Sequence, residues 1–186
     1  MLSEHTRTTT PAGVETGPEQ DPAAALAAVE TVPELADAVR SLARTAGGAD
    51  GATFVLREDD HCFYVDEDSI APLWKGQRFP IASCISGWAM LHDTAVAIAD
   101  ITLDERIPQD AYRPTFVRSL LMVPVGHGGP VAAIGVYWAR LHHATDDEQR
   151  RVRAVADAAA AVLDRIGLDT APWAPTFSLR RPPTAR

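Results

Sequence analysis

Two apolar runs joined by a glycine-rich turn constrain the fold more than any other feature of this chain. The runs cover residues 117–125 and 131–138, and the five residues between them are Gly-His-Gly-Gly-Pro. Glycine adopts the positive φ angles of tight turns without a steric penalty. The two runs are therefore predicted to be neighbouring antiparallel strands.

Shorter patterns divide much of the remaining sequence into helices and strands. Thr31, followed three residues later by Glu34, forms a capping-box pattern that predicts a helix ending at Gly47-Gly48. Thr145 and Glu148 repeat the capping box before the last helix. We also expect a short helix over 23–30, a hairpin of strands 52–56 and 62–65, an irregular stretch over 69–83, a helix over 85–92, a strand over 95–99, and a loop and helix over 104–112.

This order predicts an α+β domain built on one central antiparallel sheet of five to six strands. The terminal helices would cover one face, and loops and short helices would form a pocket on the other. Residues 1–22 are rich in Thr, Pro, Gly and Glu without an apolar period, which predicts a disordered segment. The domain would span 23–168, and 169–186, with four prolines, would be a flexible tail.

Charge and composition restrict the partners. The net charge of −8 argues against nucleic acid and anionic membranes, because both would repel the chain. No run approaches the roughly 20 apolar residues that cross a bilayer, and the polar first ten residues lack the apolar core of a signal peptide. The two cysteines, Cys62 and Cys84, suit reduced thiols. We therefore expect a cytoplasmic protein.

The last helix carries apolar residues whose spacing alternates between three and four. This spacing is typical of a helix that packs along another helix. We expect a homodimer held by this seam, with the helix that carries Leu35, Val39 and Leu42 contributing to it. The seam consists of Val152, Val155, Ala159, Val162 and Ile166.

Several separated motifs resemble the GAF domains of bacterial histidine kinases. They are Ile-Ser-Gly-Trp-Ala-Met at 85–90, Ile-Ala-Asp-Ile at 98–101, Asp-Glu-Arg-Ile-Pro at 104–108, Tyr-Arg-Pro at 112–114, and the apolar runs 117–124 and 133–138. The resemblance implies a GAF-like (PAS-like) sheet and a non-catalytic sensory or regulatory domain. Such a domain binds a small molecule or relays a signal through a helix-mediated dimer, and we expect a kinase or regulator partner to carry the output.

Chromophore-binding members of this family suggest where a ligand would lie. Strand alternation places Leu120 and Met122 on one face of their strand, and Val136 and Trp138 on one face of the next. We assign both faces to the pocket, with Ser83, Asp100, Arg113 and Arg118 as polar groups near it. A solid core stays an open alternative, because buried aromatic residues need no ligand. The candidate ligand-binding residues are Trp74, Phe79, Cys84, Ile85, Trp88, Asp100, Tyr112, Phe116, Leu120, Met122, Val136 and Trp138.

The sequence does not identify a cofactor. Covalent bilin attachment commonly uses a cysteine before the strand at 117, and residues 104–116 contain neither cysteine nor histidine. His92 is the best candidate for a haem ligand, but no other feature supports haem. His61 and Cys62 point to opposite faces of a strand and cannot share a metal, and His142-His143 are interpreted as a solvated loop. We therefore expect neither covalently bound bilin nor haem, assign no metal ligands, and leave the cofactor open.

The cysteines leave an enzymatic alternative open. Some GAF proteins reduce free methionine sulfoxide with a catalytic cysteine and resolving partners, and Cys84 precedes a helix start that could lower its pKa. Cys62 lies in a strand, and the further cysteines of those enzymes are missing, so two buried thiols are favoured. No hydrolase triad, phosphate loop or zinc spacing is present. We expect no enzyme; a reductase using Cys84 and a ligand-free dimerisation module are the alternatives.

Overall fold

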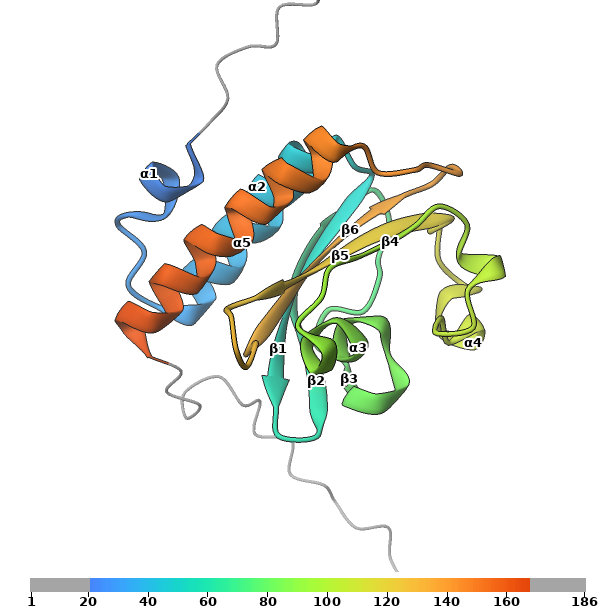
Figure 1. Ribbon diagram of the computed structural model, residues 1–186, viewed down its shortest axis with the longest axis horizontal. Coiled ribbons are helices and arrows are strands. Elements are labelled where there is room, and N and C mark those ends of the chain that lie inside the picture. Colours follow the sequence, from blue (N-terminus) through green and yellow to red (C-terminus); the bar gives the residue numbers. More distant parts are fainter. Residues whose placement is uncertain (1–20, 168–186) are drawn as a thin grey trace, which may run out of the picture.

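A six-stranded sheet forms the centre of the computed structural model, which describes residues 21–167 (Figure 1). The segments predicted to be disordered or flexible lie outside these residues, except that Asp21 caps and Pro22 begins the first helix. Between residues 21 and 167, no helix is both long and apolar enough to span a bilayer. The elements are α1 (Pro22–Leu26), α2 (Val32–Gly47), β1 (Gly51–Glu58), β2 (His61–Ser69), β3 (Arg78–Pro80), η1 (Ile81–Ser83), α3 (Ile85–His92), β4 (Val96–Ile98), η2 (Ile101–Leu103), α4 (Gln109–Tyr112), β5 (Ser119–Val125), β6 (Ala132–Trp138) and α5 (Asp146–Ile166).

All neighbouring strands pair antiparallel, in the order β3-β2-β1-β6-β5-β4. The predicted hairpin over 117–138 is confirmed as β5 and β6, and the three glycines of its turn have positive φ. Strand β3 falls in the stretch predicted to be irregular, because three residues are too few to show alternation. Its pairing with β2 places Phe79 opposite Cys62.

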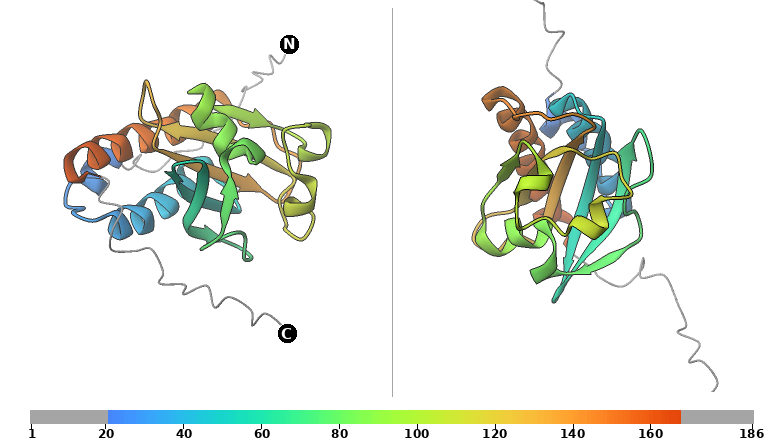
Figure 2. Two further views of the ribbon diagram at one scale, coloured as in Figure 1. Left: turned by 90° about the horizontal axis from the view of Figure 1, so that it is seen from below. Right: turned by 90° about the vertical axis from the view of Figure 1, so that its right-hand side faces the viewer.

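Helices α2 and α5 lie side by side across one face of the sheet (Figure 2). Both begin with the predicted capping boxes. Arg151 of α5 also joins the two helices, since its Nε donates to the backbone oxygen of Ala46 at 2.8 Å. The terminal helices lie on one face of the sheet only, which agrees with the predicted fold class.

The apolar seam of α5 is buried within the monomer. Val152, Val155, Ala159 and Val162 are each at most 5% exposed and belong to the core between the helices and the sheet. The expectation that these four residues join α5 to a second copy is therefore wrong, because α2 and the sheet already cover them. Ile166 is partly exposed. Homodimer formation stays a prediction, and it needs another surface.

The opposite face of the sheet is covered by α3, α4 and the 3-10 turns η1 and η2 (Figure 1). Glu67 of β2 fixes the loop that follows its strand. Its carboxylate oxygens accept hydrogen bonds from the backbone N–H groups of Leu73, Trp74 and Lys75 at 2.8–2.9 Å. These bonds hold Trp74 in the second buried cluster, against Tyr112 and Tyr137.

Candidate functional site: a pocket beside two cysteines

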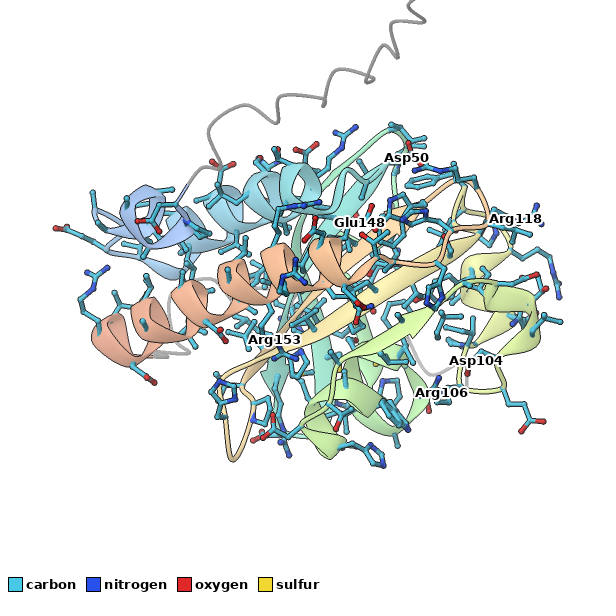
Figure 3. All side chains as sticks on the ribbon, turned by 45° about the horizontal axis from the view of Figure 1, so that its top comes forward. Asp50, Asp104, Arg106, Arg118, Glu148 and Arg153 are labelled. Atoms are coloured by element: carbon cyan, nitrogen blue, oxygen red, sulfur yellow. The ribbon has the colours of Figure 1, made fainter. Side chains whose placement is uncertain are left out.

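A cavity of about 270 Å³ lies on the face of the sheet away from α2 and α5. Three segments form its walls: the end of η1, the first turns of α3, and the segment that leads to α4. Arg106 and Asp104 lie close together on this last segment (Figure 3). The lining residues are Ala82, Ser83, Cys84, Trp88, Glu105, Arg106, Ile107 and Pro108.

Cys84 occupies the N-cap position of α3 and lines the cavity. Its Sγ lies 3.3 Å from the hydroxyl oxygen of Ser86. The turn before it packs very closely on the helix, because a Cβ atom on Gly87 would lie 1.8 Å from the backbone oxygen of Ile81. Only glycine allows this approach, so the sequence Ser-Gly after the first helical residue sets the position of the thiol.

Cys62 of β2 lies beside Cys84, although sequence reasoning did not bring the two together. Strand β3 continues directly into η1, and the Ile81 N–H donates to the backbone oxygen of Asp60 at 2.8 Å. This bond fixes η1 next to the turn that precedes Cys62 on β2. Cys62 is fully buried and Cys84 is 6% exposed, so of the pair only Cys84 faces the cavity.

The pKa values of the two cysteines are shifted in opposite directions. Hydrogen bonding from the Cys62 thiol, then from Ser86 and from the N–H groups of Gly87 and Ser86, lowers the pKa of Cys84 to about 6, against the opposing effect of burial. Hydrogen bonding to Cys84 together with burial raises the pKa of Cys62. The two shifts run in opposite directions and favour Cys84 over Cys62 as the thiol that ionises first.

Ser86 links Cys84 to one buried tyrosine, and a separate pair of hydroxyl groups is also buried in the core. The Tyr64 hydroxyl lies 3.1 Å from the Ser86 hydroxyl, and the Tyr137 hydroxyl lies 2.9 Å from that of Thr53. Burial raises the pKa values of Tyr64, Tyr112 and Tyr137, so all three stay neutral. Within residues 21–167, the Tyr112 hydroxyl is buried without a hydrogen-bond partner.

The outer wall of the cavity is built around Trp88. The Arg106 guanidinium lies 4.5 Å from the centre of the Trp88 ring system. The Asp104 carboxylate holds that guanidinium through Nε and one terminal nitrogen, and this pairing lowers the pKa of Asp104. His92 stacks on Trp88 with ring centroids 4.4 Å apart, and its side chain is exposed, outside the cavity.

Most of the predicted ligand-binding residues share one side of the sheet, but only two line the cavity. Cys84 and Trp88 are in its wall. Asp100 caps η2, where its carboxylate accepts a hydrogen bond from the Thr102 N–H at 2.9 Å. The others on this side pack in or against the second core cluster, namely Trp74, Phe79, Ile85, Tyr112, Phe116, Leu120 and Met122.

Val136 and Trp138 lie on the opposite side of the sheet, so their assignment to the pocket face is wrong. The register pairs Leu120 with Tyr137 and Met122 with Gly135. Tyr137 therefore shares the pocket side with Leu120, while Val136 and Trp138 belong to the core beneath α2 and α5. Cys62, Glu105 and Arg106 were missed as site residues. Glu105 and Arg106 belong to the Asp-Glu-Arg-Ile-Pro motif at 104–108, and this motif was the only sequence signal that pointed to them.

Residues 29–164 of the chain match the family model of the GAF domain. The chain belongs to the GAF family. None of the functionally characterised proteins compared with it is significantly similar in sequence. The GAF fold expected from the motifs is therefore confirmed.

Solved structures resemble this GAF domain in fold. The GAF domain of a phosphoenolpyruvate-protein phosphotransferase from Acinetobacter has a TM-score of 0.67 at 11% identity, covering 77% of this chain and 89% of its own. Free methionine-R-sulfoxide reductase from Neisseria meningitidis gives 0.66 at 16% identity, with 78% and 85% covered. The GAF-B domain of DevS from Mycobacterium smegmatis gives 0.58 at 16% identity, with 70% and 91% covered. At these identities the likeness concerns the fold alone.

Proposed function

We propose that this GAF domain is a sensory or regulatory module that binds a small molecule in the Cys84 pocket. The observation that carries the proposal is the 270 Å³ cavity between η1, α3 and the 104–108 segment. Its walls combine an aromatic ring, a guanidinium, a carboxylate and a thiol, which is the mixture of apolar surface and few polar groups typical of ligand sites. A kinase or regulator partner would receive the signal.

The charged groups of the cavity favour a small ligand that carries a carboxylate. The Arg106 guanidinium has five N–H donors, and its bonds to Asp104 use only Nε and Nη2. Its remaining donors can bind a carboxylate, while Trp88 offers an apolar surface. Glu105 also lines the cavity and can accept from an ammonium group. Free amino acids and small aromatic acids fit this description.

We expect binding of such a compound to be abolished by Ala82→Trp, which fills the cavity from an exposed wall residue. A ligand at about 100 times its Kd should raise the melting temperature of the wild type on the order of 5–10 °C. The measurement is a thermal-shift screen of free amino acids and aromatic carboxylates, followed by native mass spectrometry.

Ala71→Trp is the matched control, because Ala71 is exposed and lies outside the cavity wall. It should bind as the wild type does. Equal binding by Ala82→Trp would place the ligand elsewhere. If no compound shifts the wild type and the freshly purified protein carries no bound mass, the ligand-free dimerisation alternative is preferred.

The position of Cys62 favours a second candidate, the reduction of free methionine sulfoxide. The Cys84 thiolate would attack the sulfoxide sulfur, and with one proton the oxygen would pass to Cys84 as a sulfenic acid while methionine leaves. The Cys62 thiol would then displace that oxygen as water and form a disulfide. An external dithiol would restore both thiols.

For this candidate we expect Cys84→Ser to lower methionine sulfoxide turnover by at least about a hundredfold, since serine cannot act as the nucleophile. Turnover is measured as methionine released with dithiothreitol as the reductant. Ala71→Trp again serves as a folded control. A wild type without turnover would eliminate the reductase and leave the binding proposal intact.

A further inference from the structure

We propose that Cys62 and Cys84 form a peroxide-reactive dithiol, in which Cys84 is oxidised from the pocket and Cys62 converts it to an intramolecular disulfide. This modification site goes beyond ligand binding, and it requires no turnover of methionine sulfoxide. It would make the oxidation state of the pair a second input to the domain.

The geometry separates the two roles. Cys84 lines a cavity of 270 Å³, which admits a molecule as small as a peroxide, while Cys62 is fully buried behind it. Cys84 is therefore the residue that an oxidant reaches first. Cys62 is placed to attack an oxidised Cys84, because both side chains pack in the same buried cluster: β3 pairs with β2 opposite Cys62 and runs directly into η1, which ends next to Cys84.

The oxidation balances with a hydroperoxide as the only co-reactant. The Cys84 thiolate attacks one peroxide oxygen, the O–O bond breaks, and hydroxide or alkoxide leaves with the electron pair. Cys84 then carries a sulfenic acid. The Cys62 sulfur displaces its oxygen, the S–S bond forms, and the proton from Cys62 and the hydroxyl group leave as water.

The surroundings of Cys84 support a reactive thiolate. Hydrogen bonds from Cys62, Ser86 and the first turn of α3 stabilise its charge. The buried tyrosines beside it stay neutral. The positive charge of Arg57 slightly lowers the pKa of Cys62, against the larger effects that raise it. Glu105 and Arg106 are the charged residues of the cavity wall. Because the thiolate is the reactive form, the oxidation rate should rise with pH through the pKa of Cys84 and level off above it.

Two substitutions of Cys62 separate its two roles. Cys62→Ser keeps a hydroxyl that can donate to the thiolate but cannot form a disulfide. Cys62→Ala removes both functions. The full-length reduced protein is treated with hydrogen peroxide, and intact mass, with and without a sulfenic-acid trap, is followed over pH 5–8. Circular dichroism checks that each variant is folded.

We expect the wild type to lose the mass of two hydrogens, and Cys62→Ser to gain one oxygen that the trap captures. Cys84→Ser should do neither. At pH 6, Cys62→Ala should be oxidised roughly tenfold more slowly than Cys62→Ser, because the gain in thiolate nucleophilicity only partly offsets the loss of thiolate. If the wild type stays reduced, forms only disulfides between chains, or accumulates a sulfenic acid without the disulfide, the inference is overturned. The same holds if the two Cys62 variants react at equal rates.

Discussion

Val155→Glu is expected to unfold the domain rather than to separate two copies of it. Val155 is 1% exposed and lies in the core between α5, α2 and the sheet. A carboxylate there loses its hydration without gaining a partner, and removing the valine also loses apolar packing. We expect the free energy of unfolding to fall by about 3–5 kcal/mol, a large part of the stability of a domain this size.

Urea unfolding followed by circular dichroism measures this loss, with Ala154→Glu as the matched control. Ala154 is the preceding residue on α5 and is exposed, so the same charge remains in water there. Its effect should stay within about 0.5 kcal/mol. A Val155→Glu protein of wild-type stability that sediments as a monomer, beside a dimeric wild type, would contradict the structure and restore the intermolecular seam.

Gly87→Ala is expected to destabilise the domain strongly, although it adds only one methyl group beside the pocket. The added Cβ would lie 1.8 Å from the backbone oxygen of Ile81 and 2.6 Å from its carbonyl carbon. Backbone atoms cannot rotate away, so η1 and the start of α3 must separate. We expect a loss of about 3 kcal/mol, and a Cys84 pKa closer to that of an ordinary thiol, because the N–H groups that stabilise the thiolate lie in this turn.

Gly47→Ala is the control for this substitution. Gly47 is also helical, but a Cβ there would have its nearest neighbour, a side-chain carbon of Val136, at 3.4 Å. Replacing a helical glycine with alanine at a site with room stabilises by up to about 1 kcal/mol. The two glycine variants should therefore shift the urea midpoint in opposite directions, and alkylation of Cys84 over a pH series measures the pKa. Equal midpoints would show that the turn is looser than the structure indicates.

The error about the α5 seam shows the limit of helical periodicity. The spacing from Val152 to Val162 correctly indicates a helix that packs along another helix. It cannot indicate whether that helix belongs to the same chain, because the apolar stripe is the same in both cases. The apolar stripe of α2, with Leu35 and Val39, was available in the same sequence and is the partner in the structure.

The error about Val136 and Trp138 has a different origin. The alternation of side chains within β5 and within β6 was predicted correctly. The pocket face of each strand was assigned separately, however, without knowing which residues of β5 and β6 pair. A shift of one residue moves every side chain of a strand to the other face. The pairing of Leu120 with Tyr137 decides the faces, and the length of the glycine-rich turn alone did not determine that pairing.

The sequence by itself determined the features that depend on neighbouring residues: the capping boxes at Thr31 and Thr145, the hairpin around its glycines, and the order of motifs that identifies the family. Only the tertiary structure placed Cys62 beside Cys84 and covered the α5 seam with α2. Both contacts join residues that are distant in the chain, and their formation depends on strand register and on which apolar surfaces meet when the core closes.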